Sequence, residues 1–210
     1  RFAKEMWTRG IPVVWYVSPQ VWAWGKKRIP KLAKYCDKML VIFPFETETY
    51  AGTGLDTEFV GHPLVEIVRK RSGKDITRDE NLVLLLPGSR GDEINRLLMP
   101  MLKTALKLHS MKPELKLAVS LNRQSIYERC LRVFDEFKKG TTAQMPQIEF
   151  YCGQTETLLQ KACAGIAASG TVTVECAIAG LPIVVSYRLN PLSYFFGKML
   201  VSLPYFTMVN

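Results

Sequence analysis

The chain alternates between short apolar runs and longer amphipathic segments. In its first third, the apolar or β-branched runs at 11–17, 39–43 and 57–60 predict strands. Residues 26–36 carry apolar side chains at helical spacing with lysines on the other side, and residues 46–52 end in a glycine, so both segments predict helices. A repeated order of strand, helix and strand is typical of α/β proteins with parallel sheets.

The same alternation restarts after residue 81 and is more regular there. The predicted strands are nearly continuous in apolar residues, which favours a parallel sheet covered by helices on both faces. We therefore predict an α/β fold with two Rossmann-like halves. The expected strands of the second half are 82–86, 116–120, 148–151, 165–168 and 182–186, and its expected helices are 94–109, 124–137, 155–162 and 171–179.

Residues 64–79 interrupt the alternation. The stretch 69–74 reads Arg-Lys-Arg-Ser-Gly-Lys, which is polar and turn-prone and suits a linker between domains. We predict that residues 1–68 are the C-terminal part of a first Rossmann-like domain, 69–80 a linker, and 81–210 a second Rossmann-like domain. The sequence opens in what reads as the middle of a helix, without a start methionine, so we expect a piece of a longer protein with an incomplete first domain.

Composition and charge narrow the class of protein. Hydrophobic residues make up 48% and charged residues 22% of the chain, which fits a folded protein, and its apolar runs are too short to cross a bilayer. The net charge is +9, and between residues 21 and 40 the only acid is Asp37. Such a basic face favours a phospholipid surface, a phosphorylated substrate or nucleic acid, unless it is simply a solvated helix face. The cations of this segment are Lys26, Lys27, Arg28, Lys31, Lys34 and Lys38.

The loop after the strand 82–86 carries the first candidate chemistry. It reads Pro87-Gly88-Ser89-Arg90 and leads into a predicted helix. In open α/β sheets, ligands bind at the carboxyl ends of strands, where helix N-termini present backbone N–H groups. Gly88 allows close backbone approach, and Arg90 could pair with a diphosphate and offset charge on a leaving group. The alternative is an ordinary helix entry in which Asp92 and Glu93 complement the helix dipole and Arg90 pairs with one of them.

A second loop of similar composition follows the strand 165–168. Ser169-Gly170-Thr171 at the start of a predicted helix could form a compact anion-binding turn. Glu175 lies one turn further on, where its carboxylate could accept both hydroxyls of a ribose, unless it is a capping or surface glutamate. Together the two loops predict a nucleotide-sugar site.

Several other kinds of site lack their usual sequence patterns. The chain has no Asp-x-Asp and no Cys-x-x-Cys pair, so we expect no metal and no cofactor. Neither a P-loop nor a Gly-x-Ser-x-Gly nucleophile turn is present, which argues against an ATPase and a serine hydrolase.

These loops, with the strings around them, resemble the lipid-A-disaccharide synthase family of membrane-surface glycosyltransferases. The resemblance extends over nearly the whole chain. The strings that carry it are Tyr16-Val-Ser-Pro-Gln-Val-Trp-Ala-Trp24, Phe43-Pro-Phe-Glu46, Phe59-Val-Gly-His-Pro63, Leu86-Pro-Gly-Ser-Arg90, Ala168-Ser-Gly-Thr171, Ser186-Tyr-Arg-Leu-Asn-Pro191 and Tyr205-Phe-Thr-Met-Val-Asn210.

The resemblance implies a GT-B architecture, in which two Rossmann-like domains flank a cleft. It implies transfer from UDP-2,3-diacylglucosamine to 2,3-diacylglucosamine 1-phosphate, with inversion, to give a β-1,6 disaccharide and UDP. It further implies that the protein lies in the cytoplasm against the anionic inner face of the inner membrane, with no nucleic acid partner. By this resemblance Arg90 and Asn210 are catalytic, and UDP is bound by Gly88, Ser89, Arg90, Ser169, Gly170, Thr171 and Glu175.

The acceptor or membrane side would contain Ser18, Trp22, Trp24 and His62. Two tryptophans beside a basic helix could enter a headgroup region or line an acyl channel, or they could be core aromatics. The family's glycine-rich first loop and its candidate base, an aspartate, have no counterpart here, nor do its C-terminal helices. We therefore expect the 210 residues alone to lack transferase activity.

Two other readings stay open at the level of sequence. One is another GT-B enzyme with a UDP-N-acetylglucosamine-type donor. The other is a non-catalytic nucleotide-binding module that docks on a membrane surface, which would bind UDP without selecting acylated sugars.

Overall fold

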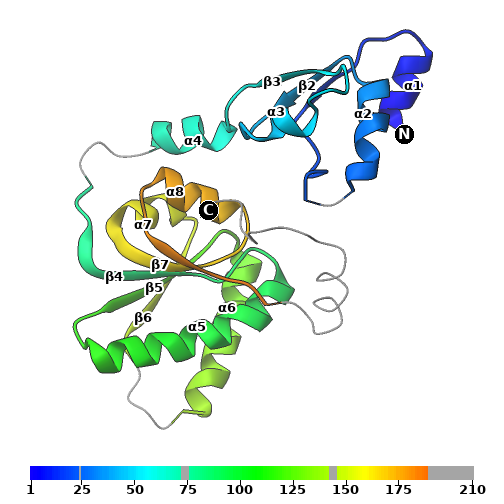
Figure 1. The fold of residues 1–210 in the computed structure, drawn as a ribbon. Coiled ribbons are helices and arrows are strands. Elements are labelled where there is room, and N and C mark those ends of the chain that lie inside the picture. Colours follow the sequence, from blue (N-terminus) through cyan, green and yellow to red (C-terminus); the bar gives the residue numbers. More distant parts are fainter. Residues whose placement is uncertain (24, 72–75, 142–145, 189–210) are drawn as a thin grey trace. The chain divides into compact units, whose positions relative to one another are not determined.

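The computed structural model describes residues 1–23, 25–71, 76–141 and 146–188 (Figure 1). The fold class is confirmed: the chain is α/β, and its strands form one three-stranded and one five-stranded parallel sheet. The described residues fall into two compact units, 1–66 and 67–188. Each of the strands predicted from the sequence is present, with ends that differ by a few residues.

The first unit contains the three-stranded sheet, in the order β1-β2-β3. Its core lies between this sheet and helices α1 and α2, around the fully buried side chains of Val21, Met39 and Val41. The elements are α1 (Phe2–Thr8), β1 (Val14–Tyr16), the 3-10 helix η1 (Lys26–Arg28), α2 (Ile29–Tyr35), β2 (Lys38–Val41), α3 (Glu46–Thr49), β3 (Asp56–Phe59) and the first part of α4 (Pro63–Arg71).

Two features of this region differ from the expectation. The face of the sheet that carries Val14, Tyr16 and the ion pairs of Lys38 is exposed, so the helices among the described residues cover only the other face. The segment read as polar and turn-prone begins with a helix, since α4 continues to Arg71. Pro63 explains this start, because proline at the first helical position is already in a helical backbone conformation and its missing N–H loses no hydrogen bond.

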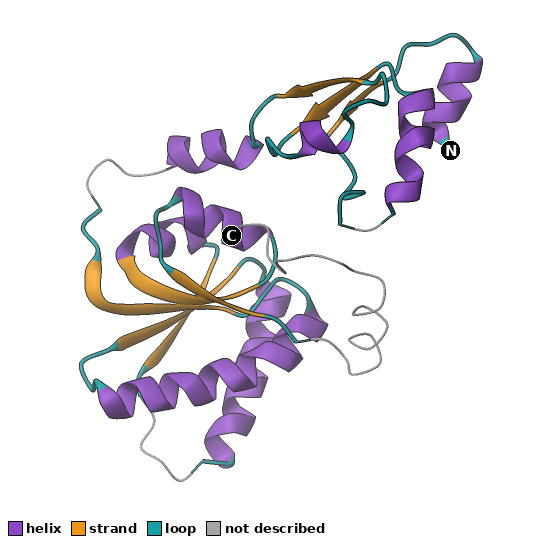
Figure 2. Ribbon diagram, in the orientation of Figure 1, coloured by secondary structure: helices purple, strands orange, loops and turns teal. Residues whose placement is uncertain are grey.

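The second unit is a three-layer sandwich built on the five-stranded sheet, with strand order β6-β5-β4-β7-β8 (Figure 2). Helices α5 and α6 cover one face of the sheet and α7 and α8 the other (Figure 1). The elements are β4 (Asp79–Leu86), α5 (Gly91–Met111), β5 (Lys116–Leu121), α6 (Gln124–Lys139), β6 (Ile148–Cys152), α7 (Thr155–Lys161), β7 (Ala162–Ala168), α8 (Thr171–Ile178) and β8 (Ile183–Ser186).

The central strand β4 shows why the apolar runs are continuous. Val83 and Leu85 pack under α5 and α6, whereas Leu84 and Leu86 pack against α7 and α8. Successive side chains of a strand point to opposite faces, so a strand covered on both faces needs apolar residues at every position. The long helix α5 instead buries one stripe at helical spacing, formed by Ile94, Leu97, Leu98, Met101, Leu102 and Ala105.

The strand order places the two candidate loops side by side. The chain moves from β4 outward to β6 on one side and then returns to β7 on the other, so the order reverses between β4 and β7. Leu86 at the end of β4 is the register partner of Ala167 near the end of β7. Ligands of open α/β sheets bind at such a reversal, outside the carboxyl ends of the strands.

Candidate functional site

The loop between β4 and α5 is organised by a glutamate. Arg90 is the N-cap of α5, and the carboxylate of Glu93, three residues on, accepts the backbone N–H groups of Ser89 (3.1 Å) and Arg90 (3.3 Å). A glutamate at this position often bonds back to the N-cap amide, and caps of this kind contribute about 1 kcal/mol. The loop therefore has a defined conformation before any ligand binds.

The position of the Glu93 carboxylate leaves room only for glycine at residue 88. The φ of Gly88 is +108°, and a Cβ there would lie 2.5 Å from Glu93 Oε2 and 3.0 Å from Glu93 Cβ. Any other residue would be strained in its backbone and would displace the carboxylate that holds the loop.

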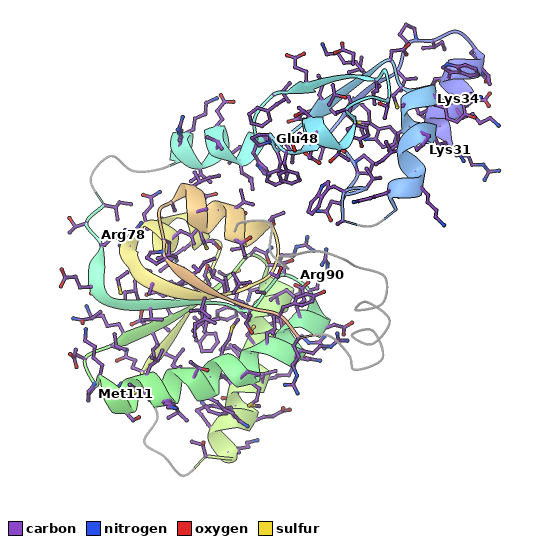
Figure 3. The ribbon with its side chains drawn as sticks, in the orientation of Figure 1. Lys31, Lys34, Glu48, Arg78, Arg90 and Met111 are labelled. Atoms are coloured by element: carbon purple, nitrogen blue, oxygen red, sulfur yellow. The ribbon has the colours of Figure 1, made fainter. Side chains whose placement is uncertain are left out.

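Arg90 lies at the N-terminal end of α5, and its side chain is 81% exposed (Figure 3). Its Nη1 donates to Glu93 Oε1 at 2.9 Å. This is the geometry of the ordinary helix entry considered from the sequence. An exposed ion pair three residues apart contributes only about 0.3–0.5 kcal/mol, however, so the guanidinium can leave Glu93 for a stronger anion at little cost.

The loop between β7 and α8 differs in detail from the expected turn. The N-cap of α8 is Gly170, and no side chain caps this helix. The backbone N–H of Ser169 continues the sheet by donating to Ser186 O at 3.2 Å. The Ser169 amide therefore takes part in the sheet, and the amides that begin α8 belong to Gly170 and the residues after it.

Gly170 has no internal reason to be glycine. Its φ of 167° is extended backbone that any residue can adopt, and a Cβ would meet no atom within 4 Å. Thr171 is exposed at the helix start, while Thr173 is buried and its hydroxyl donates to Gly170 O at 2.7 Å. Glu175 follows one turn into α8 and is half-buried.

In the first unit, three loops meet at the carboxyl ends of β1, β2 and β3. Their aromatic side chains form a chain of ring contacts, from Trp22 to Phe45 (5.1 Å), from Phe45 to Phe43 (5.5 Å) and from Phe43 to His62 (5.3 Å). Among the described residues, the buried Nε1 of Trp22 has no hydrogen-bond partner.

Several residues of the sequence strings in this unit have structural roles in its loops. Ser18 is buried; its hydroxyl donates to Pro19 O (3.0 Å) and accepts the Tyr50 O–H (2.7 Å). The buried Glu46 carboxylate accepts the N–H groups of Ile42 and Phe43 and so fixes the loop after β2. Val17 has a φ of +67°, an uncommon conformation for a β-branched residue. Such strain persists only where the surrounding structure holds it, and it often marks functional segments.

His62 precedes α4 and caps it. Its Nδ1 accepts the N–H of Leu64 at 3.2 Å, so the proton of the neutral ring is on Nε2. Burial lowers the pKa of His62, because the charged imidazolium is less well solvated there.

Comparison with known proteins gives the family. The family model described as lipid-A-disaccharide synthetase matches residues 1–210. The chain belongs to this family. The resemblance seen in the sequence strings is thereby confirmed, and the GT-B architecture is that of its relatives.

Curated relatives that match the chain carry the name lipid-A-disaccharide synthase. The chain is 38% identical to the protein of Syntrophus aciditrophicus over 99% of its own length and 55% of the relative. It is 39% identical to that of Acidobacterium capsulatum over 99% of the chain and 54% of the relative. It is 34% identical to that of Persephonella marina over 100% of the chain and 57% of the relative. The chain thus spans about half the length of the curated relatives it matches.

The structure brings the two candidate loops to one edge of one sheet. Gly88, Ser89 and Arg90 lie on the β4–α5 loop, and Ser169, Gly170, Thr171 and Glu175 on the adjacent β7–α8 segment. Ser18, Trp22 and His62 lie on the first unit, while Trp24 and Asn210 lie outside the described residues.

From the sequence, Glu93 is expected to complement the helix dipole or to pair with Arg90, but its bonds to the loop amides are not predicted, and neither is the position of Arg129 on α6. The signal for Glu93 was its spacing of three residues from the N-cap. Arg129 had no signal in the sequence, since its position follows from the packing of α6 beside α5.

Within the described residues, no helix is both long and apolar enough to cross a membrane. The described part of the chain also holds no group of three or more His, Cys, Asp or Glu side chains placed to bind a metal ion.

Proposed function

We propose that this chain provides the nucleotide-sugar side of a glycosyltransferase that joins two acylated glucosamines in lipid A synthesis. The donor is UDP-2,3-diacylglucosamine and the acceptor is 2,3-diacylglucosamine 1-phosphate; the products are a β-1,6 disaccharide 1-phosphate and UDP. The observation that carries the proposal is the pairing of β4 with β7, which sets the Pro87–Arg90 loop beside the Ser169–Glu175 segment at the reversal of strand order. Membership of the lipid-A-disaccharide synthetase family supports the proposed substrate class.

The proposed roles follow from the local chemistry. Gly170 and Thr171 begin α8, whose N-terminal dipole favours the diphosphate, and the glycine lets the ligand approach the backbone. Glu175 accepts hydroxyls of the uridine ribose. Arg90 leaves its weak pair with Glu93 and binds the departing diphosphate, where charge grows as the glycosidic bond to UDP breaks.

Inversion at the sugar carbon requires direct attack by the acceptor hydroxyl, with a base to remove its proton. We propose that this base and the acceptor loop lie in family sequence that the 210 residues do not include. Asn210 is proposed to be a further catalytic residue on the strength of its match to the family string. The 210 residues alone should therefore bind the donor nucleotide but not turn over.

The basic segment of the first unit supports a proposed contact with an anionic membrane, at the inner face of the inner membrane. Lys26, Lys27, Arg28, Lys31 and Lys34 are exposed on η1 and α2, and Figure 3 shows Lys31 and Lys34 on α2. Each cation close to an anionic lipid surface contributes roughly 1 kcal/mol. We propose that the acceptor or membrane side contains Ser18, Trp22, Trp24 and His62.

The test is turnover by a protein of the relatives' length that carries these residues, assayed with both acylated substrates. Arg90→Ala should lower kcat by on the order of 100-fold or more, because a contact that strengthens in the transition state is lost. Arg96→Ala, an exposed arginine on the same helix, is the matched control and should leave the rate unchanged. An unchanged rate for Arg90→Ala would remove Arg90 from the mechanism, and use of non-acylated sugars only would overturn the substrate class.

A further inference from the structure

Helix α6 carries a second arginine to the start of α5. Arg129 Nε donates to Asn95 Oδ1 at 2.9 Å, which fixes the guanidinium against the first turns of α5. A Cβ on Gly91 would lie 2.6 Å from Nη1 and 3.0 Å from Cζ of Arg129, so the guanidinium occupies the space left by the missing side chain. Gly91 directly follows Arg90, and the two cations therefore flank the first residue of α5.

This placement is unfavourable for a cation in the absence of an anion. The N-terminus of a helix carries partial positive charge, which repels cations. Helix α6 has no acid in its own first turn, although Glu128 precedes Arg129 and Asp92 and Glu93 lie in the first turn of α5. The Glu93 carboxylate already accepts hydrogen bonds from the Arg90 side chain and from the backbone amides of Ser89 and Arg90. Within the described residues, Nη1 and Nη2 of Arg129 make no hydrogen bond or ion pair.

We propose that Arg129 is a second phosphate-binding cation of the donor site, which acts beside Arg90 on the diphosphate of the nucleotide sugar. The proposal rests on the donor site described under the proposed function. A nucleoside diphosphate carries more than one negative charge, and a single arginine that is also paired with Glu93 offsets only part of it. Asn95 holds Nε, so the two outer nitrogens present their N–H groups in the fork geometry that suits phosphate.

The experiment measures binding of UDP and of uridine to the 210-residue chain by calorimetry at low and moderate salt. Arg129→Gln should weaken UDP binding about tenfold or more, lower its salt dependence and leave uridine binding unchanged. Arg132→Gln, an exposed arginine one turn further along α6, is the matched control and should leave both affinities unchanged. If Arg129 had a purely structural role, Arg129→Gln would weaken the binding of UDP and of uridine equally.

Gly91→Ala is a second variant that does not depend on removal of the arginine. Alanine is the better helix former, and the only close contact of the new Cβ is with the flexible end of Arg129, so the fold should tolerate it. It should displace the guanidinium and weaken UDP binding, and it should have no further effect in the Arg129→Gln background.

The outcomes separate the two claims. If the wild-type chain binds UDP and Arg129→Gln binds it equally well, the role of Arg129 is refuted while the donor site stands. If the wild-type chain does not bind UDP, the donor site fails and the role of Arg129 fails with it. Selective loss of UDP affinity in both variants supports the proposal.

Discussion

Replacement of Gly88 by alanine should destabilise the second unit through the loop that carries Arg90. The left-handed backbone at φ +108° costs an L-residue about 1–2 kcal/mol. The new Cβ also forces the Glu93 carboxylate away from the amides of Ser89 and Arg90, which removes a cap that contributes about 1 kcal/mol. The expected loss of unfolding free energy is therefore about 2–3 kcal/mol.

The chain provides a control and an internal reference for this measurement. Gly153 also has positive φ (+74°), but its Cβ would meet no atom within 4 Å, so Gly153→Ala isolates the backbone cost. All four tryptophans of the sequence lie before residue 25, so their fluorescence follows the first unit, whereas far-UV circular dichroism follows both.

In urea, Gly88→Ala should lower the circular dichroism midpoint by about 1 M or more, given slopes of about 1–3 kcal/mol per M for small domains. This shift of the midpoint should exceed the shift caused by Gly153→Ala. The tryptophan transition, which follows the first unit, is the internal reference for both shifts. Equal shifts for the two variants would refute the reasoning, because they would mean that Glu93 does not depend on the absence of a side chain at residue 88.

Two further predictions concern residues away from the donor loops. Arg78 donates to Ala162 O and Ala179 O, each at 2.5 Å, and so holds the ends of α7 and α8 at the amino end of β4. Arg78→Ala should lower the free energy of unfolding in urea by about 2–4 kcal/mol. Retention of wild-type stability would contradict this role of Arg78. His62 should titrate below pH 6.5 in NMR, with its signal identified by its loss in His62→Gln, since the sequence holds only two histidines. Because the folded pKa is the lower one, the unfolded chain takes up this proton first, and stability should fall as the pH drops below 6.5 and level off below the folded pKa; a His62 pKa above 6.5 would contradict the burial of its ring.

The sequence predicted the order of elements because each strand and helix carries its own period of apolar residues. The two candidate loops could be expected at one edge for the same reason, since alternating units lead to a parallel sheet whose loops share that edge. Helix α4 was not predicted, because the polar residues at 69–74 were interpreted as a linker and Pro63 was not interpreted as a helix start.

Contacts between elements could not be read from the chain. The approach of Arg129 to Gly91 depends on how α6 packs beside α5, and the ring contacts of Trp22 depend on the register of three strands. The capping of α8 by Gly170 was also not foreseen, because the bonding of Ser169 to Ser186 arises only once β8 pairs with β7. Local patterns determine elements, while side-chain partners follow from tertiary packing.

The most direct test of the donor site is UDP binding to the chain with Gly170 replaced by asparagine. Asparagine is among the best N-cap residues, and no atom within 4 Å opposes its Cβ, so the fold should be unaffected. We expect UDP to bind the wild-type chain. Gly170→Asn should weaken this binding at least about tenfold with an unchanged unfolding midpoint, because the side chain fills the place of the ligand. Unchanged UDP affinity in Gly170→Asn would contradict a donor site at the junction of β4 and β7.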